Sequence, residues 1–73
     1  MTVNGIVRGK TDVELLAAFK DIETLHREGA VGDGPFRAIK REMEACGVEN
    51  TSSLHLAESC VLFEIARRWA RQP

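Results

Sequence analysis

The sequence predicts an all-α protein: a small three-helix bundle with a short irregular or extended N-terminal arm. Apolar residues recur every three or four positions in three segments of the chain, which is the spacing of one face of an α-helix. Capping residues or a proline precede these segments, and glycines follow the first two. A chain of 73 residues has room for one domain, which we divide into an arm (1–10) and a helical domain (11–73).

The N-terminal segment 1–10, MTVNGIVRGK, lacks a helical pattern. Its β-branched residues are interrupted by Gly5 and Gly9, and both residue types disfavour a helix. We expect either a frayed tail with a few side chains resting on the bundle, or an extended arm or hairpin around Asn4.

The first helix is expected over residues 12–28. Thr11 and Glu14 have the spacing of a capping box, in which each residue accepts a hydrogen bond from the other's backbone N–H. Gly29 can take the left-handed conformation that ends a helix. The apolar face consists of Leu15, Ala18, Phe19, Ile22 and Leu25.

The second helix is expected over residues 35–46, with Pro35 at its first position after Asp33 and Gly34. Gly47 ends it, and Val48 is placed to close back onto Met43. Short connections favour antiparallel packing of successive helices. The apolar face consists of Phe36, Ile39, Met43 and Cys46.

The third helix, expected over residues 53–71, is apolar on two sides. Two amphipathic helices can cover only one of these sides, so the other is predicted to bind another protein or a second copy in a homodimer. The alternative is a monomer in which the arm covers it. The main stripe consists of Leu54, Val61, Leu62, Ile65 and Trp69, and the second stripe, the predicted interface, consists of Leu56, Cys60 and Phe63.

The sequence indicates no catalytic or metal site. Zinc-ligand residue types occur at His26, Cys46, His55 and Cys60, but their spacing fits no zinc pattern. Positions 55 and 60 are about 140° apart around a helix, too far for a Cys–His nucleophile pair. We therefore expect no metal, no cofactor and no enzymatic activity.

Two carboxylates of the third helix differ in their expected surroundings. Glu58 falls within the main stripe, where it is an acid of raised pKa or, as we favour, a carboxylate that lies near the helix entrance, snorkels to solvent or pairs with a base from another helix. Glu64 is assigned to the solvated face, with Arg68 in the favourable position four residues later.

Two basic groups make nucleic-acid binding the alternative function. The net charge of −1 does not favour a polybasic binder, yet small three-helix proteins include DNA-binding regulators. The candidate nucleic-acid contacts are Arg37, Lys40 and Arg41 in the second helix and Arg67, Arg68 and Arg71 at the end of the third.

The expected location is the cytoplasm. The first ten residues do not have the pattern of a signal peptide, no segment approaches the roughly 20 apolar residues of a membrane span, and only two cysteines are present. The sequence thus favours a small non-catalytic protein-interaction or regulatory module, as in small bacterial or phage proteins. A small helical DNA-binding transcriptional regulator is the alternative.

Overall fold

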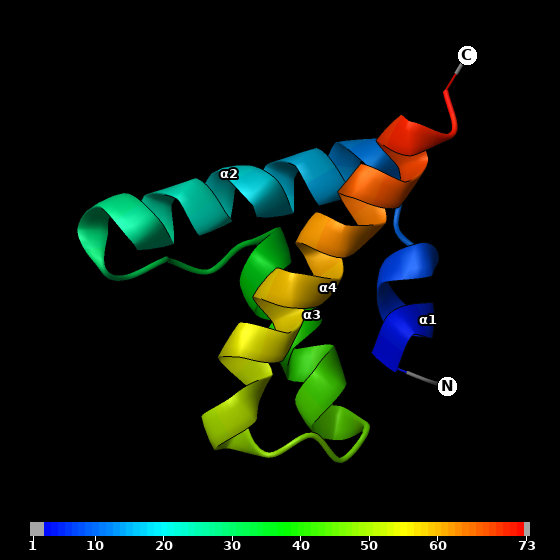
Figure 1. Cartoon of the computed structure of the whole chain (residues 1–73). Helices are drawn as coiled ribbons and strands as arrows, with labels where there is room; N and C mark the ends of the chain where they lie inside the picture. The colour runs from blue at the N-terminus through cyan, green and yellow to red at the C-terminus, as the bar shows by residue number, and fades with distance from the viewer. Residues whose placement is uncertain (1–2, 73) are drawn as a thin grey trace.

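The computed structural model describes residues 3–72 and confirms the all-α fold. Four helices occur in this range: α1 (Val3–Arg8), α2 (Asp12–Glu28), α3 (Pro35–Ala45) and α4 (Asn50–Ala70) (Figure 1). The last three correspond to the three helices predicted from the sequence, and α1 lies within the predicted arm. Residues 1 and 2 of that arm are outside the described residues.

The prediction of an irregular or extended arm is wrong for residues 3–8, which form the helix α1. Ile6 and Val7 are buried, with 3% and 2% of their surface exposed, and α1 packs against α3 and α4. Burial of these two side chains outweighs the weak helix preference of β-branched residues, because tertiary packing routinely overrides propensity.

The ends of α2 are formed by the predicted residues. The Thr11 hydroxyl accepts a hydrogen bond from the Glu14 backbone N–H, and the Glu14 carboxylate accepts one from the Thr11 N–H. Gly29 ends the helix with a φ of 79°, a left-handed conformation that costs glycine little. Leu15, Ala18 and Ile22 are buried.

The N-terminus of α3 is capped by a side chain from another helix. Gly34, at the capping position, has no side chain to offer, and the Phe36 N–H donates instead to Asp21 Oδ2 of α2 at 3.2 Å. A Cβ atom at position 34 would lie 2.9 Å from the same oxygen, so glycine makes room for the cap.

The closure predicted at the C-terminal end of α3 is present. The Val48 N–H donates a hydrogen bond to the Met43 carbonyl.

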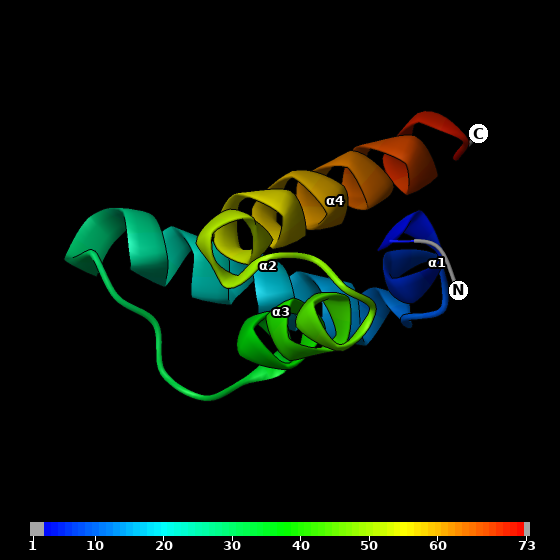
Figure 2. The ribbon, with the colours of Figure 1, turned by 90° about the horizontal axis from the view of Figure 1, so that it is seen from below.

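The relative direction of α2 and α3 differs from the prediction. The two helices run across each other rather than antiparallel (Figures 1 and 2). The connection between them swings away from both helices in Figure 2, so the chain has enough length there to change direction. Antiparallel packing is favoured only where a connection is tight.

Helix α4 begins three residues earlier than predicted, at Asn50, and has 21 residues. Ser53, expected near the cap, is buried in the first turns, where its Oγ lies 2.7 Å from Glu44 Oε2 of α3. This contact between α3 and α4 anchors the start of α4.

The buried side of α4 lies between the two stripes predicted from the sequence. Val61 of the main stripe and Cys60 of the second stripe are in the core. Leu54, Leu56 and Ile65 are half-buried against it. Leu62, Phe63 and Trp69 are exposed. The pattern of large apolar residues does not identify this side, because besides Val61 it consists of two small residues and two polar ones. The buried residues of α4 are Ser53, Ala57, Cys60, Val61 and Glu64.

We predict that replacing Ile6 by Ala lowers the free energy of unfolding by about 2–4 kcal/mol, because a buried Ile loses its contacts and leaves a cavity. Val13→Ala is the control: Val13 is 77% exposed, and the effect should be below about 0.5 kcal/mol. Urea denaturation of both variants measures the difference. Equal stability of the two would show that α1 is not packed on the core.

Candidate interaction surface

The three residues of the predicted interface have different surroundings in the structure. Phe63 is 65% exposed, as an interface residue should be. Cys60 is buried, with 8% of its surface exposed, and Leu56 is half-buried against the core. Of the three, Phe63 is therefore the one that is fully available to a partner.

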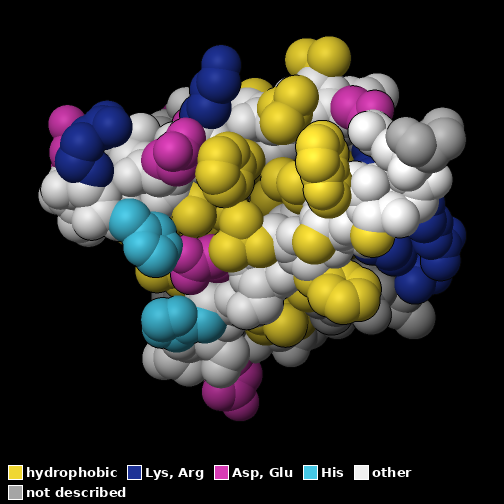
Figure 3. Space-filling model, turned by 45° about the horizontal axis from the view of Figure 1, so that its top comes forward, with side chains coloured by type: hydrophobic (Ala, Val, Ile, Leu, Met, Phe, Trp, Pro, Cys, Tyr) yellow, Lys and Arg dark blue, Asp and Glu magenta, His cyan; other side chains and the backbone are white. Residues whose placement is uncertain are grey.

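Most of the exposed apolar surface lies elsewhere on α4 and on α2. Figure 3 shows hydrophobic side chains gathered on the face that these two helices form. We call this the apolar face and define it by its large hydrophobic residues whose exposure exceeds a third. They are Leu16, Leu62, Phe63 and Trp69.

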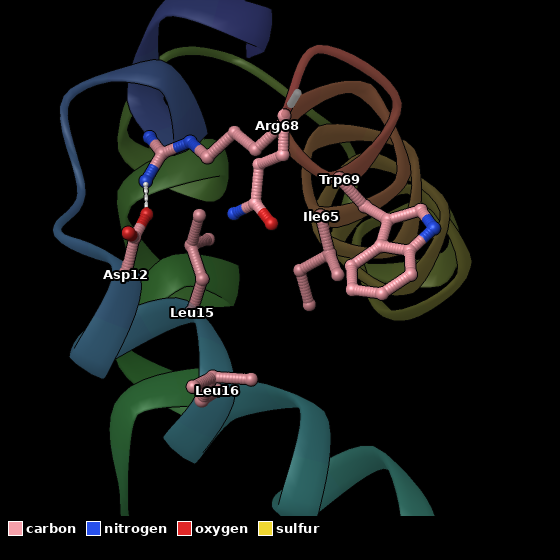
Figure 4. A pocket seen from close by; sticks show the side chains of 7 residues that line it. Asp12, Leu15, Leu16, Ile65, Arg68 and Trp69 are labelled. Carbon is pink, nitrogen blue, oxygen red and sulfur yellow. Dashed lines mark hydrogen bonds and ion pairs between the residues drawn. The ribbon is translucent and has the colours of Figure 1, made fainter.

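The apolar face is hollowed between α2 and α4. One hollow, of about 240 Å³, is smaller than the roughly 300–1,000 Å³ of small-molecule sites. In Figure 4 Leu15 and Leu16 extend from α2 toward Ile65 and Trp69 of α4, and Arg68 reaches across to Asp12. A second, shallower hollow is lined by Phe19, Ile22, Glu23, His26, Arg27 and Leu62. The second hollow, of about 560 Å³, is within the size range of small-molecule sites, but half of its lining residues have charged or imidazole side chains. The first hollow is mainly apolar and suits a protruding apolar side chain of a partner.

The solvent side of α4 carries a regular row of exposed residues, which we call the outer strip. Its members follow each other at alternating steps of three and four, the spacing that forms the seam between two packed helices. Phe63 and Ala70 lie along one edge of this row. The outer strip consists of Ser52, His55, Ser59, Leu62, Ala66 and Trp69.

Glu64, assigned from the sequence to the solvated face, is instead buried, with 1% of its surface exposed. Its carboxylate accepts hydrogen bonds from Arg67 Nε at 3.0 Å and from Arg68 Nε at 2.8 Å. The predicted pairing of Glu64 with Arg68 is therefore confirmed, but in the interior. An ion pair of this kind offsets the cost of burying the charge.

Arg68 also joins α4 to the connection between α1 and α2. Its Nη1 donates to Asp12 Oδ1 at 2.7 Å, and its Nη2 donates to the backbone carbonyls of Lys10 and Arg8 at 2.8 and 3.2 Å. Two of these acceptors are carbonyl oxygens at the end of α1, where a helix lacks internal partners. Arg68 thus caps the C-terminal end of α1 and holds this helix beside α4.

Hydrogen bonds from Arg67 and Arg68 lower the pKa of Glu64 to about 2, although burial acts in the opposite direction. The ordinary value is 4.5. A carboxylate whose pKa is lower in the folded state stabilises the fold fully above the unfolded pKa. This stabilisation is lost as the pH falls from about 4.5 to about 2.

Other members of the predicted nucleic-acid contacts are also engaged with neighbours. Lys40 donates to Glu44 at 2.8 Å, Arg41 pairs with Asp33 at 2.6 Å, and Arg37 donates to the Val31 carbonyl at 3.0 Å. Arg71, the last of the six, is exposed. These bonds use only some of the N–H donors of each side chain, since an arginine has five and a lysine three, so they weaken the case for phosphate binding without excluding it.

The zinc-ligand residue types do not come together. His26 Nε2 of α2 bonds Glu58 Oε1 of α4, and a partner from another helix is one of the three surroundings that the sequence favoured for Glu58. Cys46 and His55 are exposed, and Cys60 is buried. Within residues 3–72, no group of three or more potential ligands is close enough to hold a metal ion.

Comparison with protein-family models, curated proteins and solved structures finds no match to this chain. Among the helices of the described range, none has the combined length and apolarity to cross a bilayer.

We predict that Glu64→Gln lowers the free energy of unfolding at pH 7 by about 2 kcal/mol, because the buried charge that the two arginines stabilise is removed. The difference from wild type should shrink between pH 4.5 and 2, where Glu64 itself becomes protonated. Urea denaturation at pH 7 and pH 3 measures both effects. Glu23→Gln, at an exposed position, is the control and should change little at either pH.

Proposed function

We propose that the protein is a small non-catalytic interaction module of the cytoplasm that binds another protein chain through the apolar face. The observation that carries this proposal is the exposure of Trp69 and Phe63, 75% and 65%, on the same long helix. Aromatic residues dominate the energy of many protein interfaces because they bury a large area with few rotatable bonds.

The energetic cost of the apolar face supports a binding role. Each large apolar side chain left in water forgoes roughly 1.5–3 kcal/mol of burial free energy. A domain of this size has only a few kcal/mol of core stability to spare. Four such residues on α2 and α4 therefore mark a surface that gains by being covered.

The charges near the apolar face support the same proposal. Asp12, Arg68, Glu23 and Arg27 line the two hollows, so the apolar centre has both signs of charge beside it. Protein interfaces have this composition, with an apolar centre and a polar rim. Nucleic-acid binding draws less support, since the candidate basic residues are largely engaged with acceptors of the protein.

Photo-cross-linking from a single position tests the proposal. A benzoylphenylalanine at position 70, beside the outer strip, should form covalent products in the native cells. The same probe at position 38 on α3 is the matched control, because both positions are exposed helical alanines. Products from position 70 but not from position 38 support the proposal. The absence of products from position 70 contradicts it.

We also predict that Phe63→Glu abolishes binding at this surface while the fold remains. Phe63 is exposed in the monomer, so the free energy of unfolding should change by no more than about 0.5 kcal/mol. Circular dichroism with urea denaturation measures the fold, and loss of the cross-linked product measures binding. If Phe63→Glu unfolds the protein, residue 63 belongs to the monomer core and this assignment is wrong.

A further inference from the structure

We propose that α1 is a strap that opens and closes as a unit while α2, α3 and α4 stay folded, and that Arg68 is the latch that holds it closed. This inference goes beyond the proposed function and does not depend on it, because it concerns a movement of the free chain. The length of α1, the small number of its attachments and the bonds of Arg68 carry it.

Helix α1 depends on the rest of the molecule for its order. It has six residues, and isolated helices shorter than about 12–15 residues are marginal in water. It is ordered where it packs on α3 and α4. Once detached, it has too few hydrogen bonds of its own to stay helical, so detachment and unfolding of α1 are a single step.

The attachments of α1 are few compared with those among the other helices. Two buried side chains, Ile6 and Val7, hold it to the core, and Lys10 at its end pairs with Glu42 of α3 at 2.9 Å. Among the described residues, nine of the eleven buried hydrophobic side chains belong to α2, α3 and α4. The core of these three helices therefore persists when α1 leaves, and segments with few buried contacts are those that open separately.

The guanidinium group of Arg68 is divided between α1 and the rest of the molecule. Its Nη2 donates to the carbonyls of Arg8 and Lys10, at 3.2 and 2.8 Å. Its Nε donates to Glu64 and its Nη1 to Asp12, at 2.8 and 2.7 Å. Because the guanidinium is planar and rigid, these two carboxylates set the direction of Nη2. Opening of α1 breaks only the two Nη2 bonds and leaves the carboxylate bonds in place.

The latch is accessible from the apolar face. Asp12 and Arg68 both line the first hollow, and their ion pair crosses it (Figure 4). A group that enters the hollow and alters this pair also alters the hold of Arg68 on α1, since the two effects are linked. Opening of α1 in turn uncovers Ile6, Val7 and the apolar surface of α3 and α4 beneath them. The strap thus connects the hollow with a second apolar surface that is concealed while α1 is closed.

Native-state hydrogen exchange in low concentrations of urea tests whether α1 opens as a unit. The N–H groups of Gly9 and Lys10 bond carbonyls of α1, both at 3.2 Å, and report its opening. The N–H groups of Ile22, Ile39 and Val61 report the other three helices. We expect equal urea slopes for the first two amides, at most about a third of the slope of the other three, because the slope follows the surface exposed.

Two outcomes of this experiment would overturn the strap. Exchange of Gly9 and Lys10 with the same slope as the interior amides would mean that α1 opens only when the whole protein unfolds. Exchange of these two amides with no dependence on urea would mean that α1 frays residue by residue and does not open as a unit.

The substitution Asp12→Ala tests the latch. It removes one of the two carboxylates that orient Arg68, so exchange at Gly9 and Lys10 should accelerate at least threefold, while exchange at Val61 should change less than twofold. Asp33→Ala is the matched control. The Asp12 and Asp33 side chains are 77% and 75% exposed and each pairs with an arginine, but the partner of Asp33 is Arg41 of α3.

No change at Gly9 and Lys10 is expected from Asp33→Ala. If Asp12→Ala leaves the exchange of these two amides unchanged, or if Asp33→Ala accelerates it equally, Arg68 is not the latch. A similar acceleration at Val61 would also contradict it, because the change would then act on the whole fold rather than on α1.

Discussion

The ion pairs of Glu64 and Arg68 fix how α4 is rotated about its own axis, and the rest of the structure depends on that rotation. Glu64 is buried against Arg67 and Arg68, and Arg68 reaches Asp12 and the end of α1. A rotation that buried Trp69 would pull Glu64 away from these partners and leave Arg68 without its acceptors, which is expensive for buried charges. With these contacts in place, the outer strip has to face the solvent.

The distribution of residues over α4 reverses the usual arrangement. A carboxylate and a serine are inside, whereas Leu62, Phe63 and Trp69 are outside. A short chain cannot surround its longest helix on all sides, and α1 adds only one small layer over it. Residues whose polarity does not match their burial are concentrated at functional surfaces. The exposed side of α4 shows such a mismatch, and the partner chain that we propose would cover it.

Much of the fold could be predicted from capping residues, because Thr11, Gly29, Pro35 and Gly47 act through local geometry. Other features, besides the direction of α3 relative to α2, could not. Helix α1 exists because α3 and α4 bury Ile6 and Val7, a long-range effect. The buried side of α4 was missed because small and polar residues form it. Of the predicted interface, Phe63 was placed on the surface correctly, while the burial of Cys60 depends on neighbours that periodicity along one helix does not specify.

The cap that Asp21 provides for α3 has a consequence for folding. Since the side chain that completes the start of α3 belongs to α2, an isolated α3 segment lacks its cap, and 11 residues are too few for a stable helix in water. Helix α3 therefore forms together with its docking onto α2, not before it. We therefore expect no populated folding intermediate in which α3 is ordered and α2 is not.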